Sequence, residues 1–167
     1  MKNVLLSTDL KELYDLAYIG VLVQGHASME VSDTTVGDSC AYMGKGDLNH
    51  IRCGVGHTLS DDFMLAHASK FQGYVYSLMA AADSNVFDMR LLGNSDDDTL
   101  LEFLDKLQCC HDDALVESLA CEYDVNADEK FVALFRTKMH TLAESRGLSS
   151  YPLPTADNIL KMKGIPE

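Results

Sequence analysis

The strongest constraint on the fold is a helical repeat of apolar residues between positions 126 and 147. Asn126 or Asp128 can cap the start of a helix here, and Gly147 can adopt the left-handed conformation that ends one. The spacing of three and four residues places the apolar side chains on one face, which must be buried against other elements. The residues that share this face are Val132, Phe135, Met139, Leu142 and Ala143.

A second helix is predicted over residues 10–24. Asp9 can accept hydrogen bonds from free backbone amides at its start, with Glu12 reaching back to complete a capping box. Gly25 follows the last apolar position and can end the helix in the left-handed conformation. Local sequence therefore marks both ends of this element.

A run of three aspartates at positions 96–98 opens a further predicted helix. Negative charge is favoured at a helix start, and a stripe of leucines follows it. We expect this helix to end near Cys110. Asp112 or Asp113 would then cap a separate helix that reaches to about position 123.

A β-hairpin is predicted between the first helix and the rest. Its strands would be residues 40–43 and 51–55, joined by a Gly-rich and Asp/Asn-containing turn over 44–50. The expected fold class is therefore α+β, a mostly helical single domain with one small antiparallel β-hairpin. Residues 1–147 would form that domain, and residues 148–167, which hold all the prolines, a C-terminal tail.

Acidic residues outnumber basic residues two to one. The 167-residue chain has 26 Asp and Glu against 13 Lys and Arg, a formal net charge of −13. Such a field repels phosphate backbones and anionic headgroups and attracts basic protein surfaces. We therefore expect a protein partner with a basic surface, no direct nucleic acid and no membrane, since no apolar run approaches about 20 residues. Charge that only keeps the protein soluble is the alternative.

Three groups of aspartates stand at the expected helix starts. Spaced along one surface, they would attract a basic groove meant for phosphates. Helix capping explains the same residues one group at a time, so both interpretations stay open. The candidate partner-binding residues are Asp61, Asp62, Asp96, Asp97, Asp98, Asp112 and Asp113.

The cysteines predict reduced thiols in a cytoplasm. There are five, an odd number, none of them in a Cys-x-x-Cys pair, and the apolar stretch near Met1 is too short for a signal peptide. Disulfides are rare in such a compartment. Reactive or metal-binding roles for the thiols then have to be considered from their neighbours.

A zinc site is one such role. His50, Cys53 and His57 have the spacing His-x2-Cys-x3-His, and Cys40 would approach across the predicted hairpin as a fourth tetrahedral ligand. The alternative is that both cysteines are small buried hydrophobic residues and both histidines lie at the surface. No other cofactor is expected.

A thiol enzyme is a second role for the same segment. Cys53 or Cys40 would attack a substrate, His57 would act as the base, and Asp61 or Asp62 would orient it. Neighbours in sequence need not converge in space, so the hypothesis depends on the fold.

The pair His111-Asp112 resembles the metal-binding doublet of HD-type phosphohydrolases. The resemblance is limited to this doublet, and an aspartate that caps a helix explains the pair better. The residues that could complete such a metal site are His57, His67, Asp124 and Asp128.

Residues 40–44 and 52–63 resemble a group of small uncharacterised phage and prophage proteins. Their pattern pairs a Cys-x-Tyr strand with Lys-Cys-Ala-Ile-Gly-x-Leu-Ile-Pro-Asp-Glu-x-Tyr, and residues 107–112 are similar to their later Leu-Gln-x-x-His-Asp segment. Ser60 stands here in place of the usual proline, and Asp62 in place of glutamate. The resemblance implies a phage context and carries no assigned reaction.

These observations favour a non-catalytic, phage-encoded accessory protein that binds and modulates, by inhibition, a host protein in the host cytoplasm. One alternative is an acidic nucleic-acid mimic that blocks a DNA- or RNA-binding host or defence protein. Another is a small metal-dependent or Cys-dependent enzyme.

Overall fold

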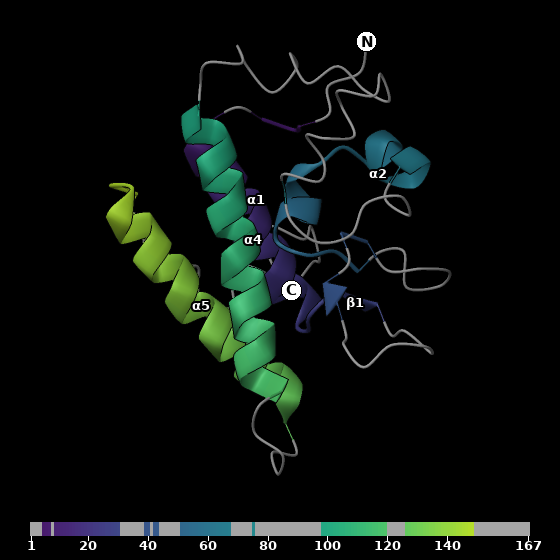
Figure 1. Cartoon of the computed structure of the whole chain (residues 1–167), viewed down its shortest axis with the longest axis vertical. Helices are drawn as coiled ribbons and strands as arrows, with labels where there is room; N and C mark the ends of the chain where they lie inside the picture. The colour runs from purple at the N-terminus through teal and green to yellow at the C-terminus, as the bar shows by residue number, and fades with distance from the viewer. Residues whose placement is uncertain are drawn as a thin grey trace, which may run out of the picture.

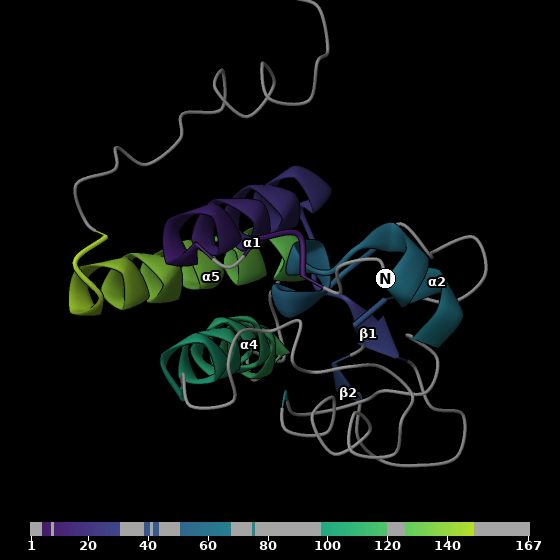
Figure 2. The ribbon, with the colours of Figure 1, turned by 90° about the horizontal axis from the view of Figure 1, so that it is seen from above.

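The structure is a computed structural model that describes residues 5–7, 9–30, 39–40, 42–43, 51–67, 75, 98–119 and 126–148. Three helices make up most of this part: α1 (Leu10–Gln24), α4 (Asp98–Leu119) and α5 (Ala127–Ser145). α4 and α5 lie side by side, with α1 behind them (Figure 1). Seen from above, α1 lies against α5 and α4 completes a three-helix cluster (Figure 2). Most of the predicted tail, residues 149–167, lies outside the described residues.

The predicted first helix is confirmed as α1. Asp9 accepts a hydrogen bond from the amide of Glu12 at 2.9 Å, and Gly25 adopts a φ of 80° while its amide donates to the Val21 carbonyl at 2.9 Å. The Glu12 carboxylate does not reach back to the Asp9 amide. It accepts from the Ser7 hydroxyl at 2.5 Å, and Ser7 Oγ accepts from the Asp9 amide at 3.0 Å.

The predicted last helix is confirmed as α5. Gly147 follows it with a φ of 69°, as the sequence predicts. One position differs, because Phe131 is buried where Val132 was expected, and Val132 is only half-buried. The buried face consists of Phe131, Phe135, Met139, Leu142 and Ala143.

The prediction of two helices on either side of Cys110 is wrong. α4 runs without a break for 22 residues, and Asp112 lies inside it rather than at a helix start. Neither glycine nor proline interrupts this segment. The Gln108 amide donates to both carboxylate oxygens of Asp112, at 2.9 and 3.0 Å, one helical turn apart. This i, i+4 pair engages the aspartate that would otherwise cap a new helix.

The prediction of an α+β fold with a β-hairpin is also wrong, since the described residues form a helical fold. Among the residues of the two expected strands that the structure describes, a single bridge occurs, from Met43 to Arg52. The backbone is already helical at Gly54 (φ −51°, ψ −50°), and a 3-10 helix, η2 (Val55–Thr58), follows. The strands β1 (Met29–Glu30) and β2 (Ser39–Cys40) pair over two residues, too short to add a sheet layer.

A short helix, α2 (Asp61–His67), follows η2, and the amide of Phe63 donates to the hydroxyl of Ser60 at 3.4 Å. Phe63 and Met64 are buried, and Leu65 is exposed.

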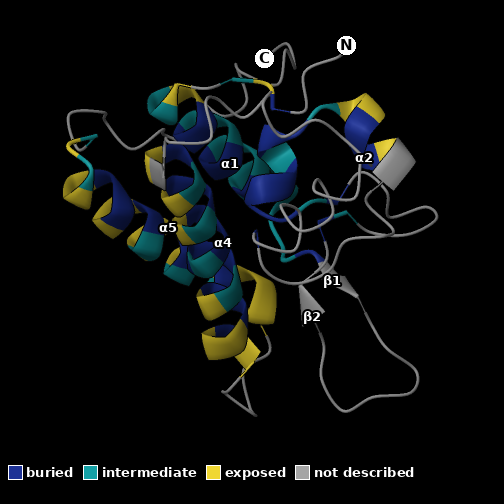
Figure 3. Ribbon diagram, turned by 45° about the horizontal axis from the view of Figure 1, so that its top comes forward, coloured by how far each residue is buried: buried dark blue, intermediate teal, exposed yellow. Residues whose placement is uncertain are grey.

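Buried residues of α1, α4 and α5 face inward, and the exposed ones lie on the outer faces of the helices (Figure 3). η2 packs against both α1 and α4, which brings the Cys53 segment against the helical core.

Candidate functional site

A chain of buried polar side chains joins the segment before η2 to α4. Cys53 has no exposed surface, and its thiol donates to Gln108 Oε1 at 3.2 Å. The same sulfur accepts from the Gly56 amide at 3.3 Å. Gln108 in turn donates to Asp112. Buried polar groups are costly unless paired, so this network holds the segment in one position on α4.

His111 extends the network to other parts of the core. Its Nε2 accepts from the Ser28 amide at 3.4 Å, and its Nδ1 lies 3.2 Å from Asp112 Oδ1. With Nε2 as the acceptor, a neutral ring carries its proton on Nδ1 and donates it to Asp112. The ring is fully buried and meets Phe131 edge-on, with the ring centroids 5.2 Å apart. His111 therefore connects α4 to α5 and to the chain before β1.

Two glycines permit the close approach around this network. A Cβ at Gly54 would lie 3.3 Å from the Leu107 carbonyl oxygen and 3.8 Å from His111 Cβ. A Cβ at Gly20 on α1 would collide with the ring of His57. Larger residues at either position would push the segment away from the helices.

His57 sits where η2 meets α1. Its Nε2 is buried and has no hydrogen-bond partner among the described residues. Burial, and then the charges of Arg52 and His111, lower the pKa of His57 to about 4. The imidazole is therefore neutral at pH 7.

The zinc hypothesis receives no support from the two ligands that the structure describes. The Cys53 thiol is engaged by Gln108, and His57 packs against α1. Within the described ranges, no three His, Cys, Asp or Glu side chains gather so that they could hold a metal ion. The Cys40 side chain and His50 lie outside the described residues, so a role for them stays a prediction.

The structure does not support the thiol-enzyme hypothesis, because the Cys53 sulfur is buried. Cys53 is a free cysteine with no exposed surface, so its sulfur is not presented to a substrate in this structure. Asp61 does not orient His57, since its carboxylate pairs with Arg52 at 2.8 Å. On α4, burial raises the pKa of Cys110 to about 12, which keeps that residue a thiol at neutral pH.

The His111-Asp112 pair is a core element in this structure. His111 packs among phenylalanines, and Asp112 accepts from Gln108. Asp128 is exposed in the first turn of α5. The His67 side chain and Asp124 lie outside the described residues.

The candidate partner-binding aspartates fall on two elements. Asp61 and Asp62 are exposed in the first turn of α2, whereas Asp98, Asp112 and Asp113 belong to α4. α2 lies on the opposite side of α4 from α5 (Figure 1). Asp96 and Asp97 lie outside the described residues. The structure thus brings Asp98 of one predicted group and both members of another, Asp112 and Asp113, onto one helix.

Three further carboxylates on α4 were missed from the sequence. Asp105 is partly exposed, and Glu102 and Glu117 are exposed. Helical spacing places them with Asp112 and Asp113 on the side away from the buried Leu104 and Leu107 stripe. The i, i+3 and i, i+4 spacing could have revealed this row, but dividing α4 into two helices hid it.

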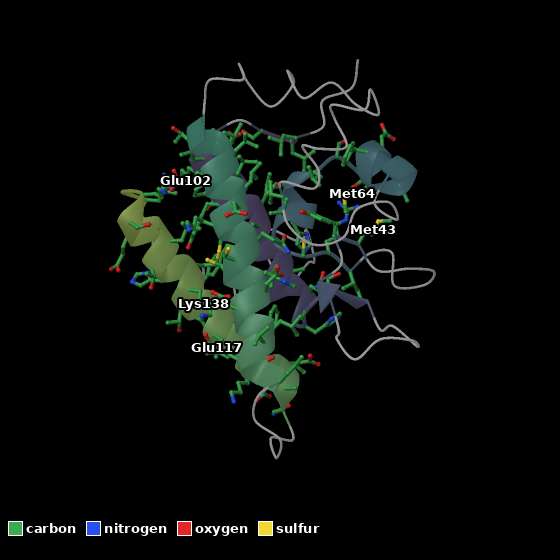
Figure 4. The ribbon with its side chains drawn as sticks, in the orientation of Figure 1. Met43, Met64, Glu102, Glu117 and Lys138 are labelled. Carbon is green, nitrogen blue, oxygen red and sulfur yellow. The ribbon has the colours of Figure 1, made fainter. Side chains whose placement is uncertain are left out.

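Two of these carboxylates face α5 and are paired with it. Glu117 Oε1 accepts from Lys138 Nζ at 2.6 Å (Figure 4). Glu102 Oε1 accepts from Arg146 Nη2 at 2.7 Å. Asp113 lies 4.0 Å from the same Lys138 Nζ. The hydrogen bond to Glu117 raises the pKa of Lys138. Ion pairs therefore neutralise part of the edge of α4 that borders α5.

Comparison of the chain with protein-family models, with curated proteins and with solved structures finds no match. None of the helices in the described part combines the length and the apolar character that crossing a membrane requires.

Proposed function

We propose that this chain is a non-catalytic, phage-encoded accessory protein that binds a basic surface of a host protein in the cytoplasm and inhibits it. The observation that carries the proposal is the asymmetry of charge between the two paired helices. α4 carries six carboxylates and one lysine, whereas α5 carries three acidic and three basic residues. The excess negative charge of the pair is therefore on α4.

The shape of α4 favours recognition by a charged surface. As a continuous helix of 22 residues it is about 33 Å long, and its carboxylates are held on a rigid element. Preorganised charge costs little entropy on binding and accelerates encounter with a partner of opposite sign. The phage context comes from the sequence resemblance alone.

An acidic nucleic-acid mimic is the second candidate, because the same row of carboxylates could occupy a groove that binds phosphates. Competition separates the two functions. A mimic is displaced from its partner by DNA or RNA, whereas an inhibitor that binds another basic surface is not. The enzyme alternative has less support, because the Cys53 thiol is sealed beneath Gln108.

The test is charge reversal on α4 with a matched control on α5. The partner is first purified from infected or host cells with the wild-type chain as bait. Asp98→Lys combined with Asp105→Lys should then slow association with that partner by about tenfold or more, and the wild-type affinity should fall between 0.1 and 0.5 M salt. The control, Asp128→Lys combined with Glu144→Lys, alters net charge equally on α5.

The result that contradicts the proposal is equal weakening by both double variants, or an affinity insensitive to salt and to charge. The first would mean that net charge alone matters. The second would mean that the carboxylates of α4 serve only the helix and its solubility.

A further inference from the structure

The outer face of α4 ends in two exposed apolar side chains. Val116 is 66% exposed and Leu119 is 48% exposed, and they stand one helical turn apart. The other large aliphatic and aromatic residues of this helix are buried or half-buried against the core. A single exposed leucine is ordinary, whereas Val116 and Leu119 together form a small exposed apolar patch.

Carboxylates surround this apolar pair. Asp112 and Asp113 lie one turn before Val116, and Glu117 follows it directly. Lys138 reaches Asp113 and Glu117 from α5, and Asp112 accepts from the Gln108 amide, so the three carboxylates are held in place beside one ammonium group. The site thus combines a small apolar centre with a negative border.

We infer that this end of α4 docks a basic amphipathic helix of the partner. We call the surface formed by Asp112, Asp113, Val116, Glu117 and Leu119 the α4 docking face. Apolar side chains of the incoming helix, three or four residues apart, would contact Val116 and Leu119, and its Lys or Arg residues would lie beside the carboxylates. The inference rests on the proposed function and names the partner's chemistry.

Charge complementarity decides between occupants. A second copy of this chain would bring the same carboxylates against one another, and like charges face to face oppose association. An anionic lipid surface would be repelled in the same way. A basic helix matches both the apolar centre and the negative border.

The probe is a synthetic 18-residue helical peptide of leucine and lysine with the leucines at i, i+3, i+4 and i+7, titrated into the full chain by calorimetry. Val116→Ser combined with Leu119→Ser should weaken the affinity of the chain for this peptide about tenfold or more, because each substitution removes apolar contact area. The control is Leu65→Ser on α2, an apolar side chain whose exposed fraction, 68%, is close to that of Val116. That control should change affinity less than twofold.

Two results would overturn the inference: equal weakening by Leu65→Ser, or equal binding of a scrambled peptide whose leucines no longer share a face. The purified host partner separates the two proposals. If charge reversal on α4 weakens that partner while Val116→Ser with Leu119→Ser does not, the proposed function stands and the α4 docking face is wrong. If the peptide's affinity depends on Val116 and Leu119 but the host partner's affinity changes neither with salt nor with charge reversal on α4, the proposed function is wrong.

Discussion

Contacts between single residues of the core could not be predicted from the sequence. Cys53 contacts Gln108 across 55 positions and Ser28 contacts His111 across 83. No local pattern encodes such separations, so residue spacing suggested Cys53 and His57 as a site and did not indicate that Gln108 contacts Cys53. The resemblance did single out residues 107–112, and the structure places Gln108, His111 and Asp112 of that stretch in one buried network.

His57 makes stability depend on pH. Its folded pKa, about 4, lies below its ordinary 6.5, so the folded state favours the neutral ring. The contribution of His57 to the free energy of unfolding is fully present above pH 6.5 and is lost as the pH falls toward 4. The free energy of unfolding then decreases by at most about 1.4 kcal/mol per pH unit. Urea unfolding at pH 7, 5.5 and 4.5 measures it.

The variant His57→Gln removes this titration, so its free energy of unfolding should vary less between pH 6.5 and 4 than that of the wild type. His140→Gln, at an exposed histidine of α5 that lies 3.3 Å from Glu144, serves as the control for removing a histidine outside the core. An unchanged slope in His57→Gln would show that other groups cause the pH dependence.

Whole helices were predictable where local signals agree. α1 and α5 have apolar spacing and a glycine with positive φ directly after their last turns, and both follow the prediction. The prediction wrongly divided α4 into two helices because Asp112 is a residue type that often caps a helix. In the structure its carboxylate accepts from the Gln108 amide instead. The prediction of a hairpin was wrong because Gly54 and Gly56 permit close packing instead. A Cβ at Gly56 would collide with the Tyr42 carbonyl.

The packing of α5 can be tested at Phe135. Its ring is fully buried beside Tyr18 and Phe131, with centroids 6.3 and 6.0 Å away. Phe135→Ala should lower the free energy of unfolding by about 3–5 kcal/mol in urea titrations. Val132→Ala, at the half-buried neighbouring position, should cost clearly less. Similar losses for the two variants would contradict the orientation of the helix.

At the scale of the whole molecule, net charge was plain from composition, but its distribution was not. The six carboxylates of α4 share a helix with one lysine, whereas α5 carries equal numbers of acidic and basic residues. Lys138 of α5 and Arg146, which directly follows α5, pair with carboxylates of α4. The distribution required knowing that residues 98–119 form one helix. It is this asymmetry that turns an acidic composition into a candidate binding surface.

The most direct test of this account maps the partner's footprint on the isotope-labelled chain by NMR. We expect the largest changes in the amides of Asp105, Asp113 and Val116 on the outer face of α4, weakening as salt is raised, with little change at Arg136 and His140 on α5. Changes concentrated instead around Cys53 and His57 would contradict the account, because they would place binding at the buried network and favour the enzyme hypothesis.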